Sequence, residues 1–105
     1  MRNYEMFDRE GKIMWGAFWT LIEMQLKELQ SAKNADDVIR ILGGSGPGDA
    51  HFAGSGGDGT VRASLFAAGW ELVWQEADYF WVMKAPDDSM ITYIEGDIYR
   101  GDKRS

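Results

Sequence analysis

The residues best suited to chemistry lie in one glycine-rich segment, residues 43–60, which holds eight of the 13 glycines in this 105-residue chain. Gly54 to Gly59 satisfies the pattern G-x-G-x-x-G, and successive glycine N–H groups beside a helix start can bind a phosphate. A dinucleotide site also needs a strand directly before this pattern and a βαβ unit around it. Residues 43–53 contain Pro47 and four glycines, so no such strand is predicted.

Residues 56–60 of this segment resemble the GGDGT motif of NAD kinases and diacylglycerol-type lipid kinases. In those families the motif ends a buried hydrophobic strand of a much larger domain, whereas the residues before it here, Ala50 to Ala53, do not form such a strand. The segment has no lysine, which a P-loop requires. We therefore interpret it as a connector and keep a nucleotide or small-ligand site as the alternative hypothesis. The residues of that site would be Gly56, Gly57, Asp58, Gly59 and Thr60.

His51 and Phe52 are the bulky side chains of the segment, and we expect them to anchor the loop on the core. A single histidine excludes zinc sites of the His-His type, and the absence of cysteine excludes disulfides and thiolate sites. The spacing shows no Ser-His-Asp arrangement. The sequence therefore predicts no catalytic residue, no metal and no cofactor, and it disfavours an enzyme.

Three helices are predicted around this segment. Residues 12–31 carry apolar residues at helical spacing, and further apolar residues widen the stripe in its first half. The stripe consists of Trp15, Trp19, Ile22, Leu26 and Leu29, and it is widened by Met14, Phe18 and Leu21. Such a helix is central to a core or is shared with a second subunit. Residues 35–42 follow the N-cap Asn34, and residues 61–68 follow Thr60 as a third helix.

Beyond Gly69 the apolar period changes to two, which predicts strands. The strands expected are residues 70–76, 79–84, 90–95 and a short 97–100, and their short connections indicate an antiparallel meander. A two-residue turn at 77–78 would place Trp74 opposite Trp81. One face then forms the main core, with Trp70, Leu72, Trp74, Trp81, Met83, Met90, Thr92 and Ile94.

The other face of this meander has an apolar centre and a charged margin. Its apolar residues are Val73, Phe80, Val82, Ile91 and Tyr93. An apolar patch with a polar rim is typical of an interaction surface. The alternative is that the N-terminal helix covers this face.

The net charge of the chain limits the kinds of molecule that it can bind. The chain has 17 acidic and 11 basic residues, a formal net charge of −6, which disfavours binding to nucleic acid. The order of helices and hairpin also resembles a winged helix-turn-helix, which leaves DNA binding as a weaker alternative. Its recognition helix would offer only Arg62 for groove contacts, where several polar side chains are needed.

The apolar run at residues 13–22 is shorter than the ~20 residues of a membrane span. It lacks a basic leader and a small-residue cleavage site, so we interpret it as a core helix in a cytoplasmic protein, with no membrane partner.

Together these patterns predict one α+β domain over residues 1–105, with two or three helices packed on a three- to four-stranded antiparallel meander. Its parts are a helical half at 12–42, the glycine-rich loop at 43–60, and a helix with the meander at 61–100. We expect a small acidic protein that acts by protein–protein interaction, as a stoichiometric inhibitor, an immunity protein or an accessory factor. We also expect it to form a homodimer.

Overall fold

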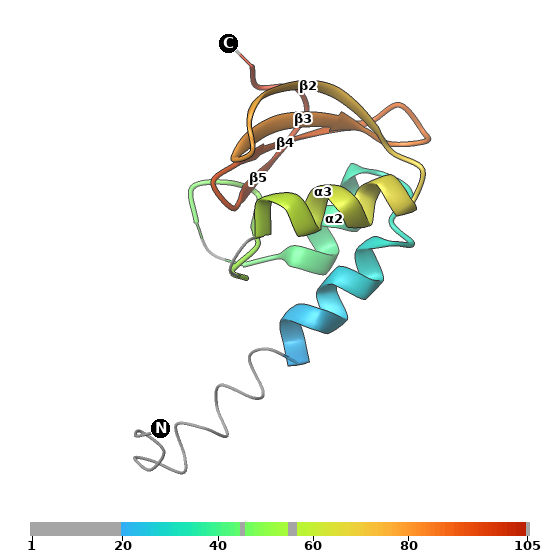
Figure 1. The fold of residues 1–105 in the computed structure, drawn as a ribbon, viewed down its shortest axis with the longest axis vertical. Helices are drawn as coiled ribbons and strands as arrows, with labels where there is room; N and C mark the ends of the chain where they lie inside the picture. Colours follow the sequence, from blue (N-terminus) through green and yellow to red (C-terminus); the bar gives the residue numbers. More distant parts are fainter. Residues whose placement is uncertain (1–19, 45, 55–56, 105) are drawn as a thin grey trace.

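The computed structural model describes residues 20–44, 46–54 and 57–104, and it has an α+β fold (Figure 1). Helices lie against one face of a five-stranded antiparallel sheet. The predicted fold class is confirmed. The sheet has one strand more than expected because two residues of the glycine-rich segment pair with it.

The first described helix covers residues 20–29, and the rest of the predicted helix 12–31 lies outside the described residues. Helix α2 spans Ala35–Leu42, as predicted, and Asn34 caps it by accepting a hydrogen bond from the backbone N–H of Asp37 at 2.8 Å. Helix α3 spans Gly57–Ala67 and so begins four residues before the predicted start at residue 61. Thr60 therefore lies inside the helix and does not cap it.

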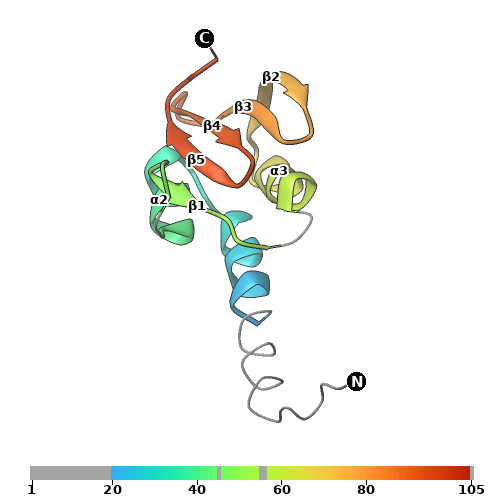
Figure 2. The same ribbon diagram turned by 90° about the vertical axis from the view of Figure 1, so that its left-hand side faces the viewer.

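Five strands form the sheet in the order β1-β5-β4-β3-β2, and every neighbouring pair is antiparallel. Figure 2 shows β2 beside β3 at one end of the sheet and β1 at the other. The strands are β1 (Ala50–His51), β2 (Glu71–Ala77), β3 (Phe80–Lys84), β4 (Met90–Ile94) and β5 (Asp97–Arg100). The sequence places β1 in an irregular loop, because two residues are too short to show an alternating pattern.

Strand β2 contains two irregularities that change the predicted pairing. Trp74 lies opposite Val82, and the expected pairing of Trp74 with Trp81 is wrong. The register shifts once between Leu72 and Trp74 and again between Gln75 and Ala77. Each extra residue in a strand moves the following side chains to the other face of the sheet. The five-residue connection from Lys84 to Met90 also places Ile91 and Tyr93 with Met83 and Trp81. For both reasons the two predicted faces are mixed in the structure.

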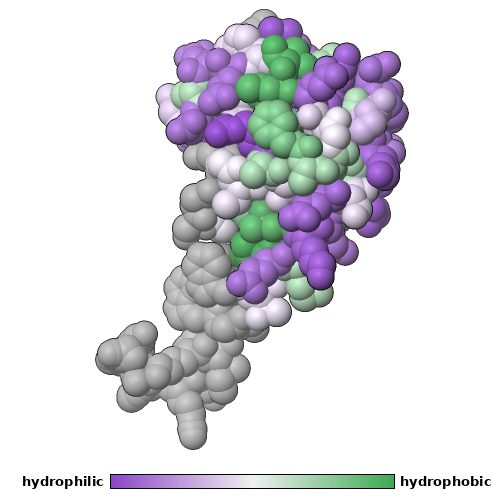
Figure 3. Space-filling model, turned by 45° about the vertical axis from the view of Figure 1, so that its right-hand side comes forward, coloured by the Kyte–Doolittle hydropathy of each residue, from purple (hydrophilic) through white to green (hydrophobic). Residues whose placement is uncertain are grey.

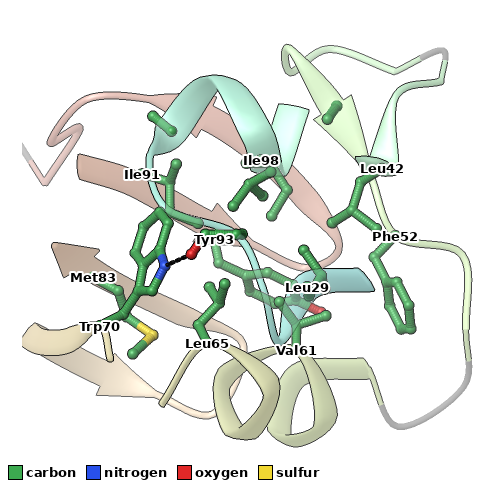
Figure 4. Close-up of a cluster of buried hydrophobic side chains, with 14 of the residues drawn as sticks. Leu29, Leu42, Phe52, Val61, Leu65, Trp70, Met83, Ile91, Tyr93 and Ile98 are labelled. Carbon is green, nitrogen blue, oxygen red and sulfur yellow. Dashed lines mark hydrogen bonds between the residues drawn. The ribbon is translucent and has the colours of Figure 1, made fainter. Parts of the chain in front are cut away.

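The core lies between the sheet and the helices (Figure 4). Trp81 and Tyr93 stack across β3 and β4 with ring centroids 4.6 Å apart and planes 2° from parallel. Trp70 belongs to the same core, and its indole N–H donates a hydrogen bond to the carbonyl of Ala32 at 2.9 Å. Leu29 of the first helix and Leu65 of α3 are both fully buried against these rings.

Candidate functional site

The five residues predicted to form an interaction surface do not share one open face. Ile91 and Tyr93 lie in the core beneath the helices, and Val82 is fully buried on the opposite face of the sheet. Phe80 packs edge-on against Trp74, with ring centroids 4.8 Å apart. Only Val73, on the outermost strand, is exposed. The connection between β3 and β4 causes this separation. Lys84 pairs with Met90, so an odd number of residues, 85–89, joins the two strands and places Ile91 and Tyr93 on the face opposite to Val82.

The C-terminal segment, residues 101–104, lies on the outer face of the sheet, which faces away from the helices. The Thr92 hydroxyl donates a hydrogen bond to the carbonyl of Gly101 and accepts one from the backbone N–H of Lys103. The Arg104 guanidinium lies 5.8 Å from the centre of the Trp74 ring. The sequence predicts that the N-terminal helix could cover this face, whereas the structure places the C-terminal segment there.

Within that segment, Arg104 also binds Asp102. Its Nη2 lies 2.6 Å from a carboxylate oxygen of Asp102, and this hydrogen bond holds the pKa of Asp102 below its ordinary value. The same bond raises the pKa of Arg104. The guanidinium is therefore fixed between a carboxylate and the Trp74 ring.

His51 and Phe52 attach the glycine-rich segment to the end of the sheet. Phe52 is 3% exposed and lies in the core, while its backbone N–H donates to the carbonyl of Gly96 at 2.8 Å. His51 Nδ1 lies 2.9 Å from a carboxylate oxygen of Asp97. Gly96 has a φ of 96°, and a Cβ there would lie 3.0 Å from the His51 ring. This close approach requires glycine.

The ligand site kept as an alternative lies at the start of α3. Gly57, Asp58, Gly59 and Thr60 are the first residues of that helix, and Gly56 lies outside the described residues. Strand β1, which comes before them, is antiparallel to β5 at the end of the sheet. A dinucleotide fold places a parallel strand there. Ligand binding by these residues stays a prediction.

Large apolar side chains are exposed on the side of the molecule where β2, α3 and the first helix meet the solvent. Phe66 of α3 is 48% exposed, and Leu72 and Val73 of β2 are 38% and 39% exposed. We name these three residues the α3–β2 patch. Figure 3 shows continuous apolar surface over these elements, between hydrophilic areas. Ala63 and Ala67, also exposed, extend the patch along α3.

A second apolar area lies on the first helix. Leu21 is 52% exposed and Met24 is 58% exposed, and we name this pair the helix patch. The apolar pattern of the sequence does not mark Phe66 or Met24 as surface residues, and it assigns Leu72 to the core face, whereas Leu72 is exposed. The exposure of Phe66 could have been predicted from helical spacing. Val61 and Leu65 lie on one buried stripe of α3, and Phe66 lies outside that stripe.

Acidic side chains surround the α3–β2 patch. Glu71 and Glu76 of β2 and Asp78 of the following turn are exposed. Arg62 of α3 lies 3.7 Å from Asp78, and the side chain of Arg62 is only 20% exposed. The charged residues of β2 and its following turn are therefore acidic, while Lys84, which pairs with Glu71 in the sheet, and Arg104, over the Trp74 ring, are basic groups beside the same strand.

The edge of β2 limits how a partner can bind. Among the described strands β2 has a neighbour only on the β3 side, so its other edge is unpaired within that part of the chain. Its two register shifts interrupt the regular spacing of backbone N–H and C=O groups. Such bulges protect an open edge against pairing with a further strand. A partner would therefore contact the side chains of β2 more than its backbone groups.

An open pocket of about 320 Å³ lies at the start of α2. Its lining residues are Asn34, Ala35, Asp36, Asp87, Ser89, Met90, Arg100 and Gly101. Most of its polar groups bind one another. The Ser89 hydroxyl accepts from the N–H of Ala35 and donates to Asp87, and this second bond lowers the pKa of Asp87. Arg100 pairs with Asp36. These groups are satisfied within the chain and do not converge on a ligand.

The described residues contain no cluster of three or more His, Asp or Glu side chains that could hold a metal ion. None of the helices in the described ranges has the length and apolarity needed to cross a membrane.

Comparison of the chain with protein-family models, with curated proteins and with solved structures gave no match.

Proposed function

We propose that this chain acts by binding another protein through the α3–β2 patch. The observation that carries the proposal is the exposure of Phe66, Leu72 and Val73 on neighbouring elements. Exposed apolar surface of this kind, rimmed by polar residues, marks interaction sites in many proteins. Aromatic residues such as Phe66 are enriched in protein–protein interfaces.

The charges around the patch indicate the chemistry of the partner. Glu71, Glu76 and Asp78 are exposed beside it, and Arg62 is largely buried. A partner that fits this surface presents an apolar residue to Phe66 and lysine or arginine side chains to the acidic rim. Complementary charges of this kind raise the association rate and select the partner.

The activity that we propose is stoichiometric binding, in which the chain inhibits, neutralises or assists its partner without chemical turnover. An inhibitor, an immunity protein and an accessory factor all meet this description, and we propose that the chain acts in the cytoplasm. The absence of cysteine supports this location, because small secreted domains often depend on disulfides.

The test begins with capture of the partner from the native cell and its identification. Purified partner and chain should then form a complex of defined mass, and its affinity should decrease as salt is added. Phe66→Glu and Leu72→Glu should each weaken binding by at least tenfold. Leu21→Glu is the matched control, because Leu21 is 52% exposed and lies on the first helix, outside the α3–β2 patch. Wild-type affinity in both patch variants, with native circular dichroism, would refute the proposal.

A further inference from the structure

Arg62 of α3 is a largely buried cation whose hydrogen-bond donors are not all used. Its side chain is 20% exposed, and the guanidinium nitrogen Nη1 is buried without a hydrogen-bond partner in the described part of the chain. The other terminal nitrogen, Nη2, lies 3.7 Å from a carboxylate oxygen of Asp78, which is too long for a hydrogen bond. A buried donor that lacks a partner destabilises a fold, so this arginine is incompletely satisfied in the free chain.

The other arginines of the described residues differ from Arg62 in this respect. Arg40, Arg100 and Arg104 are more exposed, and each donates a hydrogen bond to an aspartate of its own chain. Water can also hydrate an exposed guanidinium, whereas it does not reach the buried Nη1 of Arg62. The incomplete bonding of Arg62 is therefore a property of this one site, and it indicates a group that arrives from outside the chain.

Asp78 is held loosely in the turn that follows β2. Its side chain is 80% exposed. The carboxylate oxygen that faces Arg62 also accepts a hydrogen bond from Nε2 of Gln75 at 3.4 Å, which is a long distance for such a bond. Exposed contacts of this kind contribute little to stability. A carboxylate of another molecule can therefore replace Asp78, whose side chain then turns into the solvent.

Arg62 lies next to the α3–β2 patch. Phe66 follows it by four positions on α3, so the two side chains are neighbours on one flank of the helix. Phe66 is 48% exposed, and Gln75 belongs to β2, the strand that carries the other two residues of the patch. A molecule that covers Phe66 therefore also meets this arginine.

We propose that Arg62 binds a carboxylate of the partner, an aspartate or glutamate side chain that takes the place of Asp78. The planar guanidinium of arginine donates two parallel hydrogen bonds to one carboxylate, and such charge-assisted pairs are stronger than neutral ones. The pair forms beside Phe66, so the partner carries an acidic residue next to the apolar residue that covers this ring. This inference rests on the proposed function and adds to it the group that the partner presents to Arg62.

Acetate is a probe for this site that does not require the partner. The full chain is titrated with sodium acetate at constant ionic strength, with sodium chloride as the reference, and the side-chain N–H resonances of arginine are followed by NMR. The Arg62 resonances should shift and saturate with acetate alone, whereas those of Arg104, already bound to Asp102, should change little. Asp78→Asn should lower the acetate concentration at half-saturation at least twofold, because it removes the competing carboxylate. Equal responses to both salts, or no effect of Asp78→Asn, would overturn the inference.

Arg62→Met separates binding from a structural role. Methionine keeps an apolar stem and removes the guanidinium, so the variant should unfold at the same urea concentration as the wild type or at a higher one. Its affinity for the partner that binds through Phe66 should fall at least tenfold, and Arg40→Met, at an exposed site on α2, should not change it. A less stable Arg62→Met chain, or one with wild-type affinity, would overturn the inference. Wild-type affinity in Arg62→Met together with lost binding in Leu72→Glu would leave the proposed function intact.

Discussion

The Thr92 hydroxyl accepts a hydrogen bond from the backbone N–H of Lys103 at 2.8 Å. Thr92 is fully buried in the middle of β4, and its hydroxyl also donates to the carbonyl of Gly101 at 2.7 Å. One buried side chain thus binds the backbone of the C-terminal segment at two points. Arg104, over the ring of Trp74, adds a third contact at the outermost strand. The segment therefore joins β4 to β2 across the outer face of the sheet.

Replacing Thr92 with valine should release this segment. Valine keeps the shape of the side chain but removes both hydrogen bonds. The carbonyl of Gly101 and the N–H of Lys103 then lose their partner in the protein and must be hydrated instead. We expect a loss of about 1–3 kcal/mol in the free energy of unfolding, measured by urea denaturation. Trypsin should also cleave the folded variant faster after Lys103 and Arg104 than it cleaves the wild type. If stability and cleavage both match the wild type, Thr92 does not hold the segment.

The sequence predicts elements well where one local signal decides them. Asn34 and the acidic first turn define the start of α2, and both bounds of that helix are correct. The change of apolar period after Gly69 locates the meander. The bounds of β5 are also correct, and the predicted ends of the other meander strands differ from the observed ones by at most one residue.

The faces of the sheet could not be predicted in the same way. A bulge has no reliable signal in one sequence, and the irregularity between Gln75 and Ala77 contributes to placing Trp74 opposite Val82. The odd length of the connection 85–89 places Ile91 and Tyr93 on the core face. The α3–β2 patch depends on tertiary contacts, since Phe66 is exposed only because α3 turns Val61 and Leu65 to the core. Coverage of the outer face by residues 101–104 depends on the Thr92 hydroxyl, whose partners lie nine and eleven positions away.

Phe52 and His51 should contribute unequally to attachment of the glycine-rich segment. Phe52→Ala removes a side chain that is 3% exposed, and the cavity should lower the free energy of unfolding by about 3–5 kcal/mol. His51→Ala breaks the contact with Asp97 at the surface, where such pairs contribute about 0–1 kcal/mol. Thermal unfolding of both variants would measure the difference. Equal losses would show that the segment is not held mainly by Phe52.

The N-cap of α2 offers a test of local helix stability. Asn34→Ala removes the side-chain acceptor for the backbone N–H of Asp37, which should cost about 1 kcal/mol. Asn34→Asp keeps an acceptor at the same position and is the control, with stability near that of the wild type. Chemical denaturation at neutral pH compares the three chains. An alanine variant as stable as the wild type would mean that another group replaces the cap.

Asp37 should make the stability of the chain depend on pH. Its pKa lies below the ordinary value of 3.8, mainly because its carboxylate accepts a hydrogen bond from the backbone N–H of Lys33, with a further bond from Arg40. A carboxyl group whose pKa is lower in the folded state binds more protons when the chain is unfolded. Its stabilising effect is therefore complete above the unfolded pKa and is lost as the pH falls through the folded pKa.

The test compares wild type and Asp37→Asn by urea denaturation between pH 7 and about pH 2.5. Asparagine keeps an oxygen that can accept from Lys33, but it cannot titrate. We expect the wild type to lose more stability than the variant on acidification. The variant should still lose some, because Asp87 and Asp102 also have lowered pKa values. Identical pH dependence in the two chains would show that Asp37 has the same pKa in the folded and unfolded states.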